Sequence, residues 1–97
     1  MSFVHLHAHS EYSMLDGASR IGEMFDAAAT HDMPACAITD HGVMYGALDF
    51  YKSGTKSGVK PILGMEGYLF QGHRGEKPPQ KEAAEKTCHL TLLASDD

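Results

Sequence analysis

The sequence has no long hydrophobic run: no apolar stretch of the 97-residue chain approaches the roughly 20 residues that a membrane-spanning helix needs. The first residues also lack the basic region that opens a secretory signal peptide. Only two cysteines are present, Cys36 and Cys88, and they do not form a closely spaced pair, which argues against a disulfide scaffold or a thiolate zinc site. We therefore expect one small cytoplasmic domain in which both cysteines are small buried thiols.

Basic residues are scarce in the first half of the chain. Residues 1–50 contain seven acidic side chains and one basic side chain, whereas residues 51–97 contain six acidic and seven basic ones. An acidic region of this kind is a poor binding surface for the phosphate backbone of a nucleic acid. It suits divalent cations, which can bridge to an anionic substrate. The alternative is that acidic side chains only solvate helices, which we favour for Glu23, Asp26 and Asp49.

Histidines are plentiful near the N-terminus, where His5, His7 and His9 alternate with apolar residues. A period of two predicts a strand over residues 3–9. Successive side chains of a strand point to opposite faces, so the three imidazoles are expected to share one face. A buried row of imidazoles would leave many ring nitrogens in need of partners, and histidines two residues apart can bind one metal ion or two neighbouring ions.

The remaining pattern alternates helices and strands. Apolar residues at helical spacing predict a helix over residues 20–32 with Ser19 as its N-cap, and a second helix over residues 45–58 closed by Gly58. Strands are expected at residues 35–40, 59–66 with an extension to 70, and 89–95. Residues 71–86 are rich in glycine, proline and charge, and predict a mobile loop with one helical turn at 80–86. This order predicts an α/β fold with a parallel sheet.

Residues of metal-binding type follow the ends of successive predicted strands. Strand ends converge on one rim of a parallel sheet or barrel, so we expect these side chains to lie close together. A ligand set of imidazoles and carboxylates without thiolates suits a catalytic zinc, manganese or ferrous ion. Two such ions would form a clamp for phosphoester hydrolysis. The candidate ligands are His7, His9, Asp16, His41 and Glu66.

Three further assignments stay open. His89 precedes its apolar run, so it can reach the rim only if the chain returns as an antiparallel hairpin. Asp40 could orient an imidazole behind the ligands or could be an ordinary strand-end aspartate. Ser10 and Ser13 have no neighbouring base and acid that would make either a nucleophile, and we interpret them as hydrogen-bonding residues of the loop.

Four segments, in this order and spacing, resemble the polymerase and histidinol phosphatase (PHP) domain: "HLHAHSEYSMLDG", "AITDHGVMYGALDFY", "GVKPILGMEGY" and "HLTLLA". The opening segment and "TDHGVMYGALDFY" favour the branch found at the N-terminus of bacterial replicative DNA polymerases over the histidinol phosphatases. The resemblance covers essentially all of residues 1–97.

The resemblance implies a distorted (β/α)7 barrel with up to three metal ions on its rim, of which this chain would hold about four mostly parallel strands and two helices. It assigns metal ligation to His7, His9, Asp16, His41, Glu66 and His89, whereas His5 stands where the family often has aspartate. It further implies hydrolysis of phosphoesters, including 3′ DNA ends during proofreading. DNA and other replisome subunits would be partners of the parent polymerase.

The family's later motifs, a histidine and an Asp–x–His pair, would lie beyond residue 97. We therefore expect the chain alone to hold an incomplete site, to hydrolyse little DNA and to self-associate through open strand edges. Two alternatives to a phosphoesterase are a catalytically silent module that supports the polymerase and a free-standing metal-binding protein.

Overall fold

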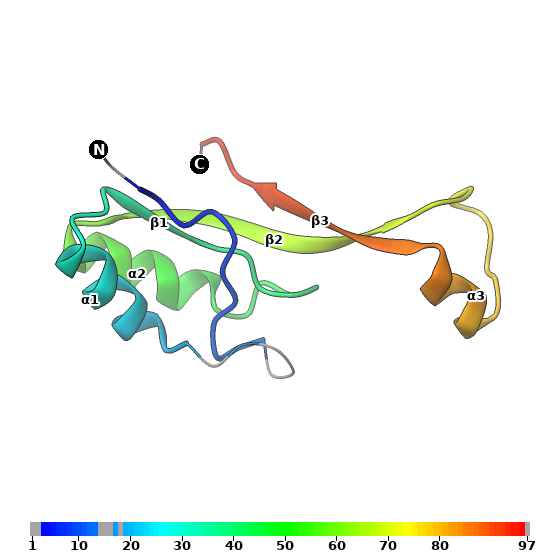
Figure 1. Ribbon diagram of the computed structural model, residues 1–97, viewed down its shortest axis with the longest axis horizontal. Helices are drawn as coiled ribbons and strands as arrows, with labels where there is room; N and C mark the ends of the chain where they lie inside the picture. The colour runs from blue at the N-terminus through cyan, green and yellow to red at the C-terminus, as the bar shows by residue number, and fades with distance from the viewer. Residues whose placement is uncertain (1–2, 14–16, 18, 97) are drawn as a thin grey trace.

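The computed structural model describes residues 3–13, 17 and 19–96. Its three strands form one sheet in the order β1–β2–β3, with β1 parallel to β2 and β3 antiparallel to β2 (Figure 1). The protein is therefore α/β as predicted, but the described residues form three strands and three helices instead of four mostly parallel strands and two helices. The elements along the chain are α1 (Ile21–Thr30), β1 (Ala35–Ile38), α2 (Ala47–Ser57), β2 (Lys60–Phe70), α3 (Gln80–Glu85) and β3 (Thr87–Leu93).

The core lies between α1, α2 and one face of β1 and the first half of β2. Phe25 of α1 and Phe50 of α2 are almost fully buried, and their ring centroids lie 4.6 Å apart. Cys36 and Ile38 are two residues apart on β1, so both side chains face the helices, which explains their burial with the two rings. Cys36 is thus a buried thiol as predicted, with its pKa raised by burial, whereas Cys88 is only partly buried.

Gly54 allows α2 to approach β2 closely. A Cβ added there would lie 2.7 Å from Pro61 Cβ and 2.8 Å from Phe25 Cζ. Gly54→Ala should therefore lower the free energy of unfolding, because overpacking costs about 1 to 3 kcal/mol and exceeds the helix preference of alanine, about 1 kcal/mol. Urea denaturation measures the change. Gly22→Ala on α1 is the matched control, since its Cβ would meet nothing within 4 Å; equal stabilisation by both substitutions would contradict this packing.

The N-terminal histidine segment runs beside β1 but is not a regular strand, so that prediction is wrong in detail. The Ala37 amide donates to the His5 carbonyl and the Thr39 amide donates to the Ala8 carbonyl, at 3.0 and 2.8 Å. Between these two hydrogen bonds the N-terminal segment advances by three residues, from 5 to 8, whereas the β1 side advances by two, from 37 to 39. One additional residue shifts the side-chain alternation, as in a β-bulge, and His5 lies apart from His7 and His9, in a groove beside α1.

The helix ends agree with the sequence at one position and differ at another. Gly58 closes α2 in the left-handed conformation, at φ +82°, which confirms the prediction. Helix α1 instead has Arg20 as its N-cap, without a side-chain capping bond. Ser19 pairs with Ser10 in an isolated bridge, and its carbonyl accepts from the Glu11 amide at 2.8 Å, so its backbone is committed to the loop before the helix begins.

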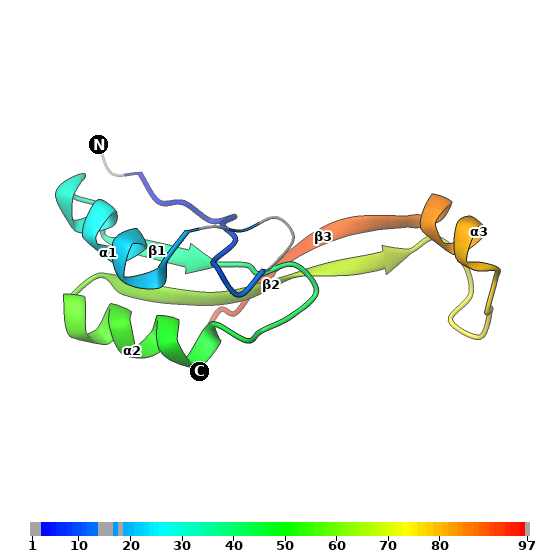
Figure 2. The ribbon, with the colours of Figure 1, turned by 90° about the horizontal axis from the view of Figure 1, so that it is seen from below.

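Strands β2 and β3 form a hairpin that projects beyond the two packed helices, with α3 near its tip (Figure 2). The projection makes the molecule 46 Å long and about half as wide, with a radius of gyration of 15.4 Å. A compact domain of this length has a radius of gyration of about 12.5 Å. Within the described residues, no helix is long and apolar enough to cross a membrane.

Candidate metal centre

The site forms where the chain continues beyond the C-terminal end of β1. Residues 39–41 extend β1, and His41 pairs with Glu66 of β2 in an isolated parallel bridge. The Glu66 amide donates to the Asp40 carbonyl at 3.0 Å, and the Gly42 amide donates to the Glu66 carbonyl at 2.8 Å. The amide and the carbonyl of Glu66 are thus both bonded to the segment that follows β1, which places this residue of β2 beside the end of β1.

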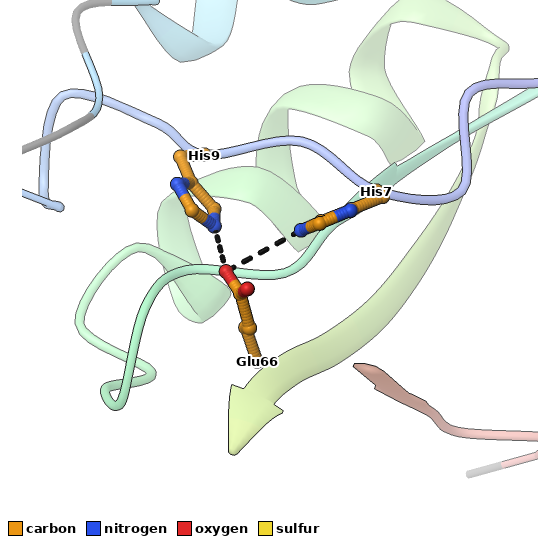
Figure 3. A group of neighbouring side chains, drawn as sticks. All are labelled: His7, His9 and Glu66. Carbon is orange, nitrogen blue, oxygen red and sulfur yellow. Dashed lines mark hydrogen bonds and ion pairs between the residues drawn. The ribbon is translucent and has the colours of Figure 1, made fainter. Parts of the chain in front are cut away.

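One group of possible ligands joins the N-terminal segment to β2. The imidazoles of His7 and His9 both point at the carboxylate of Glu66 (Figure 3). His7 Nε2 lies 3.3 Å from Glu66 Oε2, and His9 Nε2 contacts the same oxygen. One ligand atom from each residue lies within 4.8 Å of the other two, which is close enough for one metal ion.

A second group joins the end of β1 to the hairpin and shares the same glutamate. His89 Nδ1 lies 3.1 Å from Glu66 Oε1, the oxygen that the first group does not use. His41 Nε2 and His89 Nε2 lie 3.2 Å apart. Two nitrogens that bind one tetrahedral ion at about 2.0 to 2.1 Å are separated by about 3.3 Å. His41, Glu66 and His89 therefore offer a second set of atoms spaced for one ion.

The position of His89 follows from the hairpin. Because β3 returns antiparallel to β2, His89 pairs with Tyr68, two residues beyond Glu66 on the same face of the sheet. The alternative parallel connection would have carried His89 to the opposite rim. The hairpin prediction is thus confirmed, and it brings this histidine to the candidate centre.

Glu66 forms the buried base of the site, and its partners differ in exposure. Its side chain is 6% exposed, His9 is 17% exposed, and His7 and His89 are 56% and 51% exposed. Burial raises the pKa of the Glu66 carboxyl, but hydrogen bonds and positive charge from His7 and His9 outweigh burial and hold that pKa below its ordinary value. The carboxylate is therefore ionised near neutral pH although its side chain is almost fully buried.

Asp40 organises the loop behind the histidines. Its buried carboxylate accepts hydrogen bonds from the Ser10 amide, the Ser10 hydroxyl and the Ser13 hydroxyl, at 2.6, 2.9 and 3.0 Å. Ser13 Oγ also accepts from the His41 amide at 2.9 Å. The two serines are loop hydrogen-bonding residues, as predicted. Asp40 thus links the loop to the backbone of His41 through Ser13. This is the role of an ordinary strand-end aspartate, the second of the two alternatives given above. That Asp40 also orients an imidazole stays a prediction.

Asp16 lies outside the described residues, and its role as a metal ligand stays a prediction. His5 belongs to neither ligand group of the described residues. His5 lines a separate groove of about 470 Å³ beside α1, with Ala8, Met24 and Cys36 among its neighbours there. The bulge in the N-terminal segment explains the separation of His5 from His7 and His9.

Tyr68 borders the site and was not singled out from the sequence. Its ring centroid lies 5.1 Å from that of His41 and 5.5 Å from that of His89. The sequence feature that could have identified Tyr68 is its spacing. It follows Glu66 by two residues on a predicted strand, which places both side chains on one face.

Tyr12 ties the same loop to α2 through a hydrogen bond from its hydroxyl to Asp49. That hydrogen bond and then the charge of Asp49 raise the pKa of Tyr12 above its ordinary value of 10.0. The associated stabilisation is complete below about pH 10 and is lost as the pH rises through the higher folded value.

Asp49→Asn is expected to lower the pKa of Tyr12 toward 10, because it removes the charge that opposes phenolate formation. The measurement is an absorbance titration at alkaline pH, with the corresponding Tyr12→Phe titration subtracted. Asp26→Asn, an exposed change on α1, is the control. An unchanged Tyr12 transition in Asp49→Asn would show that the contact does not persist in solution.

Comparison with known proteins shows the family to which the chain belongs. The PHP domain family matches residues 5–97. The chain is 54% identical over 77 residues to a DNA polymerase III subunit alpha of Saccharopolyspora erythraea, which covers 79% of this chain and 6% of that protein. Proteins of the same name from Mycobacterium tuberculosis and Thermus aquaticus are 45% and 42% identical over 98% and 99% of this chain, which correspond to 9% and 8% of their own lengths.

These relatives are more than ten times longer than the segment they share with this chain, so the similarity concerns one part of each of them. The family match, in contrast, includes nearly every residue and all four histidines and the glutamate of the two ligand groups. The chain belongs to the PHP domain family.

Proposed function

We propose that this chain is the N-terminal PHP domain segment of a bacterial DNA polymerase III alpha subunit, and that its site holds divalent metal ions for phosphoester hydrolysis. The observation that carries the proposal is the shared glutamate: each carboxylate oxygen of Glu66 faces a different histidine group. A carboxylate between two ligand sets is the arrangement expected of a two-ion centre.

The residues present fit zinc, manganese or ferrous iron. The five side chains supply nitrogen and oxygen donors without thiolate, and their mixed exposure leaves the exposed side open to substrate and water. Ions bound there would lower the pKa of water and stabilise charge on a phosphoester. His7, His9 and Glu66 would hold one ion, and His41, Glu66 and His89 another, with Asp16 as a further proposed ligand and the family's third ion beyond the two groups described.

The protein's own contribution is to position these donors. Asp40 and Ser13 fix the loop and the backbone of His41, and the hairpin fixes His89 opposite Tyr68. The proposed substrate is a 3′ DNA end, and the proposed partners are DNA and replisome subunits acting with the cytoplasmic parent polymerase. The open sheet would then be part of a (β/α)7 barrel. The outer edge of β3, on which no other described strand pairs, would favour self-association of the isolated chain.

The first test is metal binding followed by hydrolysis. Calorimetric titration of the metal-free chain with Zn²⁺ or Mn²⁺ should show binding that chelator reverses. Release of nucleotide from a 3′-labelled primer should be strong for the complete parent polymerase carrying an inactivated polymerase site, sensitive to chelator, and weak for the 97-residue chain. No metal binding by either protein would contradict the proposal.

One observation favours the second candidate, a silent module that supports the polymerase. Among the described residues, no buried side-chain nitrogen or oxygen lacks a hydrogen-bond partner, so protein groups alone satisfy the buried carboxylate of Glu66. A parent polymerase that binds metal and gains thermal stability, yet releases no nucleotide in the primer assay, would establish this alternative.

A further inference from the structure

Tyr68 combines ring contacts on the side of the metal centre with a largely exposed side chain. The side chain is 61% exposed, although its ring contacts the imidazoles of both His41 and His89. The plane of the Tyr68 ring makes an angle of 32° with the imidazole plane of His41 and 79° with that of His89. Two neighbouring rings therefore hold the tyrosine from the side of the metal centre, while much of its surface faces solvent.

Gly42 makes room for this ring. Its backbone has φ +70°, and a Cβ added there would lie 2.8 Å from Tyr68 Cε2. The glycine also donates its amide to the carbonyl of Glu66, so the turn that carries His41 is adjusted both to the glutamate and to the tyrosine. The positive φ by itself favours glycine at this position, and the short approach shows that the Tyr68 ring lies against the turn that carries His41.

An exposed aromatic ring beside a phosphate-binding centre can stack on a nucleobase. The contacts with the two imidazoles favour one ring position beside the centre, which reduces the conformational entropy lost when a base stacks on the ring. A simple phosphate or a sugar phosphate has no flat face to match this surface, whereas an unpaired terminal nucleotide has one directly attached to its phosphoester group.

We propose that Tyr68 is a substrate-binding residue that stacks on the unpaired terminal base of a DNA strand whose phosphoester lies at the candidate metal centre. This inference rests on the proposed function and narrows its substrate class to single-stranded nucleic acid ends. The ring supplies affinity for the base without regard to sequence, since every base presents an aromatic face.

The experiment follows base stacking and does not depend on turnover. The 97-residue chain is loaded with Zn²⁺ and mixed with a short oligodeoxythymidylate that carries 2-aminopurine as its 3′-terminal base, a phosphorothioate at the last linkage and a 5′ dye. Stacking on Tyr68 should quench the 2-aminopurine emission, and anisotropy of the dye gives the Kd. Metal-free chain provides the baseline.

Tyr68→Phe should retain the quench, because phenylalanine keeps the aromatic face. Tyr68→Ala and Tyr68→Leu should lose the quench and weaken binding roughly 5- to 150-fold, the loss expected for one stacked base. Tyr51→Ala is the matched control, because Tyr51 lies on α2, is 46% exposed and lines a different groove. An oligonucleotide with an abasic 3′ end should bind wild type as weakly as the normal oligonucleotide binds Tyr68→Leu.

The outcomes separate the two proposals. Metal-dependent binding with the same quench in Tyr68→Leu and wild type would overturn the stacking role while leaving the metal-dependent function intact. Equal binding of the abasic and normal strands by wild type would also overturn it. No metal-dependent binding of any oligonucleotide by a wild-type chain that binds Zn²⁺ would overturn the inference, whereas failure of the chain and of the parent polymerase to bind Zn²⁺ would overturn the proposed function.

Discussion

Glu66→Gln is expected to reduce the affinity for Zn²⁺ or Mn²⁺ by more than about 100-fold. The substitution keeps the size of the side chain but removes the charge and one oxygen that faces a histidine group. Loss of a residue that only supports a ligand costs roughly 10- to 100-fold in affinity, so loss of a carboxylate shared by two groups should cost more. Calorimetric titration of the metal-free proteins measures the effect.

The matched control is Glu82→Gln, because Glu82 is also a glutamate in an ion pair, at 3.1 Å from Lys86, but lies on α3 away from both histidine groups. Its metal affinity should equal that of wild type. If Glu66→Gln binds as tightly as Glu82→Gln, the two groups do not form the metal centre.

Asp40→Ala should be the most destabilising single change, with a loss of about 3 to 5 kcal/mol from the free energy of unfolding. It leaves three buried donors of the Ser10 and Ser13 loop without their acceptor, and each unsatisfied buried donor costs about 1 to 3 kcal/mol. A domain of this size is stable by only about 5 to 15 kcal/mol, so a large share of the stability would be lost. Urea denaturation measures the loss.

Asp40→Asn tests the mechanism of this destabilisation. Its amide oxygen can still accept from the Ser10 amide and the Ser13 hydroxyl, and its amide group can donate to the Ser10 hydroxyl, so we expect a smaller loss of about 1 to 2 kcal/mol. Asp26→Ala, an exposed change on α1, should lie within about 0.5 kcal/mol of wild type. A loss for Asp40→Ala no larger than that of Asp26→Ala would contradict the hydrogen-bond account.

The sequence predicted best the elements whose pattern and packing agree. Residues 45–58 have apolar positions at helical spacing and a glycine at the end, and α2 ends at Gly58 as expected. The strand pattern of residues 59–70 became one continuous strand because parallel pairing with β1 and antiparallel pairing with β3 use successive parts of it. In these segments local preference and tertiary contacts favour the same structure.

Where the prediction failed, contacts between distant residues determined the result. Alternation suggested that His5, His7 and His9 share a face, but pairing with residues 37 and 39 inserts one additional residue into the N-terminal segment. No pattern within residues 3–9 reveals this, because the partner strand imposes the register. The place of His89 depends on how residues 71–86 return the chain, and the antiparallel return that the short loop favoured is confirmed. Asp16 lies outside the described residues, and its role stays a prediction.

The distance along the chain between the site residues has a consequence for folding kinetics. His9 and Glu66 are 57 positions apart, and His41 and His89 are 48 positions apart. Contacts of this separation form only after long segments of chain have been ordered, at a large entropic cost. A rapid-mixing signal from metal binding would therefore follow the formation of the native topology and lag behind helix formation. Metal that binds only the assembled site would chiefly slow unfolding, since it stabilises contacts formed late.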